Sequence, residues 1–195
     1  MSVPVLILAG GASRRMGTRD KLLELVEGAP LLRVLAQRAL EVSDDVTVLV
    51  RPNTPARRQA VNGLAVNVLE TDAAIEGIGG SLREGCQHLS QRDAFLLVLG
   101  DLPDITGNDM RAVLEARQAA PQNEIWRGAT EDGAPGHPIL FSRACFPMLL
   151  ALRGDQGANA HMSKKRVALV NLSGQRARLD LDTPEAWDAW RQGQT

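Results

Sequence analysis

Apolar runs and helix-like stripes alternate along the first 120 residues. The continuous apolar run over residues 3–9 is typical of a strand buried on both faces, as in a parallel sheet. Shorter runs predict strands over residues 45–50, 65–70 and 94–99, and apolar positions at helical spacing predict helices over 30–42, 54–61, 81–89 and 106–120. This alternation predicts an α/β fold with a doubly wound, mostly parallel sheet.

The second half of the chain is less regular. Its pattern predicts strands over residues 124–130, 138–141, 167–172 and 177–181, some of them antiparallel. A last helix is expected to begin after Thr183 as its N-cap, with Pro184 at the first helical position. Neither a repeat nor a linker interrupts the chain, so we predict a single domain over residues 3–192.

Composition narrows the range of partners. Among 195 residues the net charge is -1, aromatic residues make up 3%, and tyrosine is absent. We therefore expect neither a nucleic-acid partner held by base stacking nor a membrane partner held by charge. The two cysteines, Cys86 and Cys145, lie among apolar neighbours and predict buried thiols in a cytoplasmic protein. The absence of a basic N-terminal region and of long apolar runs supports the same expectation.

A glycine-rich stretch with several cations follows the first predicted strand. Gly10, Gly11 and Gly17 fall at the carboxyl end of that strand, where open α/β sheets bind ligands. Glycines allow backbone N–H groups to approach a phosphate closely. The nearby cations are Arg14, Arg15, Arg19 and Lys21. The stretch therefore predicts a site for a polyphosphate.

Neither of two common phosphate loops fits this stretch. The dinucleotide pattern G-x-G-x-x-G is absent, and the spacing from Gly11 to Gly17 does not match the P-loop. Instead, the string L-A-G-G-x-x-x-R-M-G-x-x-D-K, over residues 8–21, resembles the signature loop of the molybdenum cofactor nucleotidyltransferases. These are the guanylyltransferases and cytidylyltransferases of molybdopterin.

This resemblance carries expectations about fold and chemistry. It implies a Rossmann-like sugar-nucleotide transferase fold in which the loop wraps a nucleoside triphosphate. Arg15 and Lys21 would then neutralise phosphate charge and the leaving pyrophosphate. Base or phosphate contacts are implied for Leu8, Ala9, Gly10 and Gly11.

Two aspartates are candidates for holding Mg2+. Asp101 directly follows the strand predicted over residues 94–99, and Mg2+ is commonly bound by one or two carboxylates together with phosphate oxygens. The resemblance implies that Asp101, in its Gly-Asp-x-Pro context, is the metal ligand. In "LDLDTPEAW" the family pattern matches Asp182, which implies a second metal contact. Of Asp180 and Asp182, we expect only one to face the site.

Three later segments resemble the cytidylyltransferase branch. In "EGIGGSLREG", Gly80 and Ser81 are expected to contact the nucleotide from a flexible loop before a helix, because helix N-termini bind anions. In "GHPILF", His137 is implied to bind the pterin. In "LRGDQGANA", Asp155 is implied to do the same.

The resemblance leaves the base open, because the first loop has the guanylyl form whereas the later segments have the cytidylyl form. We predict transfer of a nucleotidyl group from GTP or CTP to molybdopterin, with Mg2+ as cofactor and pyrophosphate as product. Molybdoenzymes or their chaperones are the implied protein partners. Two alternatives stay open at this point: a sugar or polyol phosphate as acceptor, and a non-catalytic carrier of the cofactor.

Overall fold

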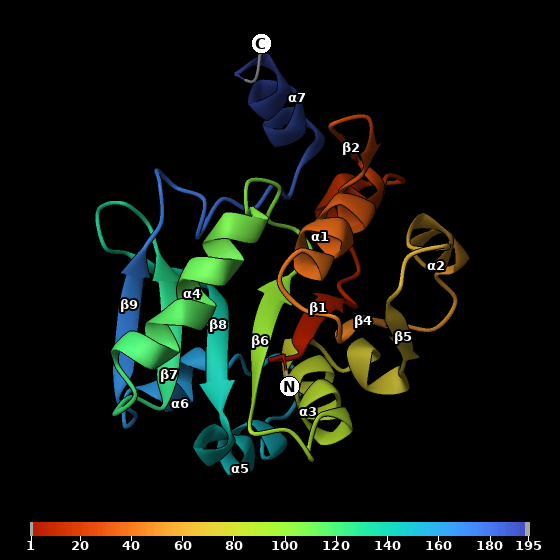
Figure 1. The fold of residues 1–195 in the computed structure, drawn as a ribbon. Coiled ribbons are helices and arrows are strands. Elements are labelled where there is room, and N and C mark those ends of the chain that lie inside the picture. Colours follow the sequence, from red (N-terminus) through yellow and green to blue (C-terminus); the bar gives the residue numbers. More distant parts are fainter. Residues whose placement is uncertain (1, 194–195) are drawn as a thin grey trace.

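A computed structural model describes residues 2–193 and contains one seven-stranded sheet (Figure 1). The strands, in spatial order, are β5 (Asn67–Glu70), β4 (Val46–Val50), β1 (Val5–Ala9), β6 (Ala94–Leu99), β8 (Pro135–Ser142), β7 (Ile125–Ala129) and β9 (Val167–Asn171). Strand β8 runs antiparallel to both of its neighbours, and the other pairs are parallel. The predicted mostly parallel sheet with antiparallel pairing in the second half is therefore confirmed.

Seven α-helices accompany the sheet in the described part of the chain. They are α1 (Leu31–Leu40), α2 (Pro55–Ala60), α3 (Ile78–His88), α4 (Gly107–Ala119), α5 (Phe146–Leu150), α6 (Asn159–Met162) and α7 (Pro184–Gln192). Short 3-10 helices lie at Arg14–Met16, Lys21–Leu23, Asp72–Ile75 and Arg143–Cys145. Helices α4 and α7 begin where predicted, because Thr106 and Thr183 accept hydrogen bonds from the backbone N–H groups of Asp109 and Ala186.

Successive residues of β1 supply two separate cores. Val5 and Ile7 pack with residues of α1 and α4 on one face, whereas Leu6 and Leu8 pack with residues of α3 and α5 on the other. This alternation follows from the two-residue period of a strand. Because helices cover both faces, β1 is buried throughout and the sheet is doubly wound as predicted.

The segment predicted as a strand over residues 177–181 is not one. The backbone N–H groups of Arg178 and Leu179 both donate to the carbonyl of Gln175, which forms a turn instead of a ladder. The apolar positions Ala177 and Leu181 are buried as in a strand, which explains the misleading pattern. The segment lies beside the start of β8, where the Ala177 carbonyl accepts from the His137 N–H at 2.8 Å.

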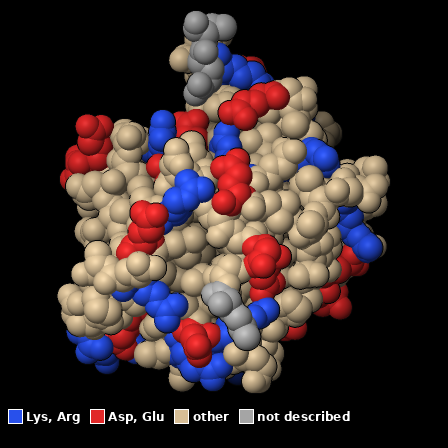
Figure 2. Space-filling model, viewed as in Figure 1, with Lys and Arg blue, Asp and Glu red and all other residues tan. Residues whose placement is uncertain are grey.

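Surface and thiols give two further observations. Figure 2 shows acidic and basic side chains intermixed over the visible face, without a patch of one sign.

Cys86 and Cys145 are both buried, and burial raises the pKa of the Cys86 thiol to about 12. Within residues 2–193, the helices are all too short or too polar to cross a bilayer.

Candidate active site

Arg57 holds the glycine-rich loop in place. This buried side chain on α2 donates to both carboxylate oxygens of Asp20, at 2.7 and 3.0 Å, and to the carbonyl of Ala9. Asp20 in turn accepts from the Leu22 N–H and so caps the 3-10 helix that carries Lys21. The sequence pattern gave no signal for Arg57, because its partners lie 37 and 48 residues away.

Lys21 joins the two predicted metal-binding aspartates. Its Nζ donates to Asp101 Oδ2 at 2.6 Å and to Asp182 Oδ1 at 2.7 Å. Arg15 pairs with the other oxygen of Asp182, and the Arg15 side chain is 71% exposed. Three segments that are distant in the sequence thus meet at the carboxyl end of β1 and β6: the glycine loop, the turn after β6 and the approach to α7.

The pKa shifts follow from this arrangement. Burial disfavours the charged form of Lys21, but the two carboxylates outweigh burial, and the pKa of Lys21 is raised. Burial likewise acts to raise the pKa of Asp182, but hydrogen bonding and charge from Lys21, with Arg15, lower it. Both groups are therefore held in their charged forms.

The sequence led us to expect that only one of Asp180 and Asp182 faces the site, and of the two only Asp182 lines the cavity beside these groups. Burial raises the pKa of Asp180, and the charges of Asp182 and Asp101 raise it further. Asp180 therefore lies close to both of them. It adds negative charge beside the site without lining the cavity.

A cavity of about 470 Å³ opens beside these groups, between the glycine loop and the start of α3. Its lining includes most of the residues that the sequence singled out. These are Leu8, Gly10, Gly11, Arg15, Lys21, Ser81, Asp101, Asp155 and Asp182. The cavity also takes in Arg51, which belongs to no motif, and Glu76, the first residue of the segment "EGIGGSLREG".

Three of the residues predicted to contact the nucleotide or the pterin do not line this cavity. Ala9 is 1% exposed, and its carbonyl accepts from Arg57. Gly80 is buried in the first turn of α3, which begins three residues earlier than predicted, so Gly80 does not lie in a flexible loop. His137 lies on β8, and its Nδ1 is buried without a hydrogen-bond partner in the described part of the chain.

The glycines before α3 allow another loop to pack closely. A Cβ at Gly77 would lie 2.0 Å from Asp155 Oδ1, and a Cβ at Gly79 would lie 2.7 Å from the Gly154 carbonyl. The Gly79 N–H donates to that same carbonyl at 2.8 Å. The glycines therefore bring Asp155 to the cavity wall, which is a different role from lending spare N–H groups to a ligand.

We expect Gly80→Ala to destabilise the protein without touching the cavity. A Cβ at Gly80 would lie 2.1 Å from the carbonyl oxygen of Ala73, a backbone atom that cannot easily move away. Urea unfolding should show a loss of about 1–3 kcal/mol, the usual effect of overpacking. Gly11→Ala is the control, since nothing lies within 4 Å of its added Cβ. Equal stability losses in the two variants would contradict this account.

Asp101 and Asp182 could hold a divalent cation together with a phosphate ligand. Asp101 Oδ1 is buried and has no partner within residues 2–193, although its other oxygen binds Lys21. The described residues contain no cluster of three or more His, Cys, Asp or Glu that would hold a metal alone. Mg2+ is normally bound by one or two carboxylates plus phosphate oxygens and water, so this donor set fits.

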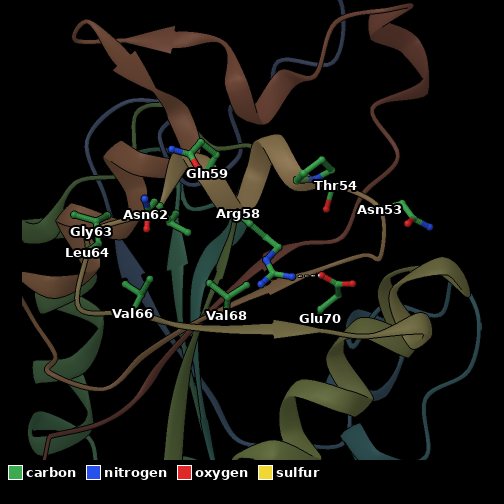
Figure 3. Close-up of a pocket in the computed structure, with 12 residues that line it drawn as sticks. Asn53, Thr54, Arg58, Gln59, Asn62, Gly63, Leu64, Val66, Val68 and Glu70 are labelled. Carbon is green, nitrogen blue, oxygen red and sulfur yellow. Dashed lines mark hydrogen bonds and ion pairs between the residues drawn. The ribbon is translucent and has the colours of Figure 1, made fainter.

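A larger cavity, of about 680 Å³, lies elsewhere, between α2 and the edge strand β5 (Figure 3). Arg58 pairs with Glu70 across it at 3.0 Å. Val66 and Val68 line the same cavity. It contains neither the glycine loop nor the paired aspartates, so we place the candidate active site in the smaller cavity.

Comparison with known proteins supports this choice of the active site. Residues 5–169 match the MobA-like NTP transferase domain. The chain is 34% identical to the probable molybdenum cofactor guanylyltransferase of Synechococcus elongatus, over 97% of this chain and 98% of the relative. It is 27% identical to the purine catabolism protein PucB of Bacillus subtilis, over 98% of each chain. It is 23% identical to the molybdenum cofactor cytidylyltransferase of Escherichia coli, over 94% and 93%.

A solved structure is also similar to this chain. The manganese complex of Rv0371C from Mycobacterium tuberculosis H37Rv superposes with a TM-score of 0.78 at 25% identity, over 97% of both chains. The family match covers well over half of the chain and includes the glycine loop, Lys21 and Asp101. The chain therefore belongs to the MobA-like NTP transferase family and is a nucleotidyltransferase.

Proposed function

We propose that this protein transfers a nucleotidyl group from GTP or CTP to molybdopterin in the cytoplasm and releases pyrophosphate. The observation that carries the proposal is the Lys21 ammonium between Asp101 and Asp182, at the mouth of a cavity walled by the glycine loop. This arrangement supports a site in which a triphosphate meets an acceptor beside cations and carboxylates. The guanylyltransferase and cytidylyltransferase relatives support the choice of acceptor.

The transfer reaction does not require a side chain to act as a general base. An oxygen of the acceptor phosphate attacks the α-phosphorus, the bond from that phosphorus to the bridging oxygen breaks, and pyrophosphate takes the electron pair. A phosphate monoester is already largely ionised near pH 7, so no proton must be removed first. Lys21 and Arg15 provide positive charge for the phosphoryl oxygens, and the loop positions the triphosphate.

Asp101 and Asp182 would hold Mg2+ in this proposal. The unpartnered oxygen of Asp101 supports that role. When bound, the ion would neutralise charge on the phosphates as a Lewis acid. Asp180 adds a third negative charge nearby and strengthens the preference of this end of the site for cations.

The acceptor is tested by pyrophosphate release. We expect release from GTP or CTP to require molybdopterin, and one of the two bases to be preferred. Thermal shift with each triphosphate and Mg2+ should show the same preference, because a ligand of the native state raises the melting temperature. Release that depends on a sugar phosphate, and not on molybdopterin, would instead favour the alternative in which a sugar or polyol phosphate is the acceptor. Nucleotide binding without turnover would favour a carrier.

A further inference from the structure

One wall of the active-site cavity is formed by a loop that follows α5. Leu152 and Ala158 are buried in the core that also contains Leu8, and the residues between them, the 153–157 loop, are exposed or half-buried. Asp155 lies in the middle of this loop and lines the cavity. The position of Asp155 therefore depends on how the loop is held between its two buried ends.

Bonds within the 153–157 loop are local. The Gln156 backbone N–H donates to the Arg153 carbonyl at 3.0 Å, and the Gln156 side-chain oxygen accepts from the Arg153 N–H at 3.2 Å. Both bonds close a turn and do not attach the loop to the rest of the protein. One attachment comes from α3, where the Gly79 N–H donates to the Gly154 carbonyl at 2.8 Å.

Arg83, on the second turn of α3, supplies another attachment. Its Nη1 donates to the Leu152 carbonyl at 3.0 Å, directly before the loop. Its Nη2 donates to both carboxylate oxygens of Glu76, at 2.9 and 3.0 Å, and the Arg83 side chain is only 19% exposed. The planar fork of a guanidinium can hold a carboxylate and a carbonyl at the same time. One side chain thus joins the start of the loop to the segment that precedes α3.

Two carboxylates line this side of the cavity, and only one of them is paired. The hydrogen bond from Arg83 lowers the pKa of Glu76, so Glu76 is charged and engaged. Asp155 forms no ion pair with any residue from 2 to 193. A free carboxylate repels phosphates and accepts hydrogen bonds from N–H or O–H donors. This wall therefore suits the neutral part of a substrate, whereas the phosphates belong with Lys21 and the glycine loop.

We propose that Arg83 is a positioning residue for the acceptor and acts through the 153–157 loop. Its bonds to Glu76 and to the Leu152 carbonyl keep Asp155 at the cavity wall before the acceptor binds. This inference rests on the proposed function and on the expectation that Asp155 meets the pterin. A pterin carries a ring N–H beside an amino group, and one carboxylate can accept from both. Without Arg83, the acceptor has to order the loop as it binds, and that cost lowers its affinity.

The first test follows the loop itself and does not depend on turnover. Arg83→Met keeps an unbranched aliphatic side chain and removes every donor. Hydrogen–deuterium exchange is read on peptides that cover residues 77–81 and 152–158. Exchange should be about tenfold faster in this variant, because the Gly79 N–H loses its carbonyl partner whenever the loop moves away. Unchanged exchange in both peptides would overturn the proposal and leave the proposed function standing.

Arg111→Met is the matched control. Arg111 lies on α4, which packs on the other face of the sheet, and it likewise joins its helix to another segment. It donates to the Asn108 side chain at 2.6 Å and to the Glu41 carbonyl at 3.4 Å, and none of these residues lines the active-site cavity. We expect wild-type exchange in both peptides and wild-type KM values. An equal acceleration in this variant would show a general loosening of the fold and would overturn the specific role of Arg83.

The second test measures turnover with molybdopterin as acceptor. Arg83→Met should raise the acceptor KM by about tenfold, while kcat and the KM for the triphosphate stay near wild type, because bound acceptor restores the ordered loop. A rise that is equal for both substrates, or an unchanged acceptor KM despite faster exchange, would overturn the role in positioning the acceptor. Wild-type protein that uses only sugar phosphates would overturn the proposed function, and the exchange measurement would still decide whether Arg83 holds the loop.

Gly79→Ala displaces the same loop by a different route. A Cβ at Gly79 would lie 2.7, 2.8 and 2.9 Å from the carbonyl oxygens of Gly154, Gln156 and Arg153. Backbone oxygens cannot turn aside as a side chain can, so the loop has to move, and the acceptor KM should rise as in Arg83→Met. Far-UV circular dichroism and the melting temperature establish which variants are folded. A folded Gly79→Ala protein with the wild-type acceptor KM is sufficient to reject the proposal, even if Arg83→Met does not fold.

Discussion

Asp101→Asn is expected to reduce kcat for nucleotidyl transfer by about 10²- to 10³-fold, because Lewis-acid stabilisation of phosphoryl charge is worth several kcal/mol and each 1.36 kcal/mol is tenfold. The substitution keeps the size of the side chain and removes the negative charge that faces Lys21. It also weakens Asp101 Oδ1 as a metal ligand, the one oxygen of Asp101 and Asp182 that has no partner among residues 2–193. Pyrophosphate release under saturating substrates and Mg2+ measures the loss.

Asp104→Asn is the matched control for this experiment. Asp104 lies in the same turn, three residues later, and its Oδ1 accepts from the indole N–H of Trp190. An asparagine can still accept that bond, so we expect wild-type kcat and nearly wild-type stability. If Asp101→Asn keeps the wild-type kcat, as Asp104→Asn is expected to, the aspartate has no role in transfer. A carrier without catalytic activity instead predicts no pyrophosphate release from the wild type.

The position of Asp101 could be predicted because the signal is local. A buried run over six residues defines β6, and the Gly-Asp that follows must lie at the carboxyl end of the strand, which in a parallel sheet faces the ligand side. The same reasoning placed the glycine loop after β1. The starts of α4 and α7 could also be predicted from the sequence, because each cap joins two residues only three positions apart.

What the sequence could not supply are the contacts between distant segments. Lys21 is 80 residues from Asp101 and 161 from Asp182, so no spacing rule relates them, and the resemblance named roles without distances. Arg57 has no motif at all, although it anchors the loop.

Two local errors have physical causes. The alternating apolar residues of 177–181 predicted a strand, but alternation shows only that one side is buried and says nothing about a neighbouring ladder. The hairpin of β2 (Leu25–Val26) and β3 (Ala29–Pro30) was missed because each strand has two residues. Its signal was Gly28, which with Glu27 takes positive φ values of 79° and 52° in the turn.

Lys21→Met should act in opposite directions on transfer and on metal binding. Transfer should fall by about 10²- to 10³-fold, since one preorganised charge at the phosphoryl group is lost. Without nucleotide, however, the ammonium neutralises the two carboxylates at 2.6 and 2.7 Å, where a cation would otherwise be held. Removing it should tighten Mn2+ binding by about tenfold, a modest share of the Coulomb energy at this distance because the site is partly solvated.

Mn2+ titration followed by electron paramagnetic resonance measures this affinity independently of turnover. Lys164→Met is the control, because Lys164 is exposed in the turn after α6 and away from the aspartates, and it should leave both quantities unchanged. Mn2+ affinity that is weaker in Lys21→Met than in the wild type would show that Lys21 supports the ion directly instead of competing with it. The expected opposite signs mean that the free enzyme binds the metal poorly until a triphosphate draws Lys21 away from Asp101 and Asp182. Metal and nucleotide would then bind with positive coupling, and that coupling should be smaller in the methionine variant, where only the direct contact between the ion and the phosphate oxygens is left.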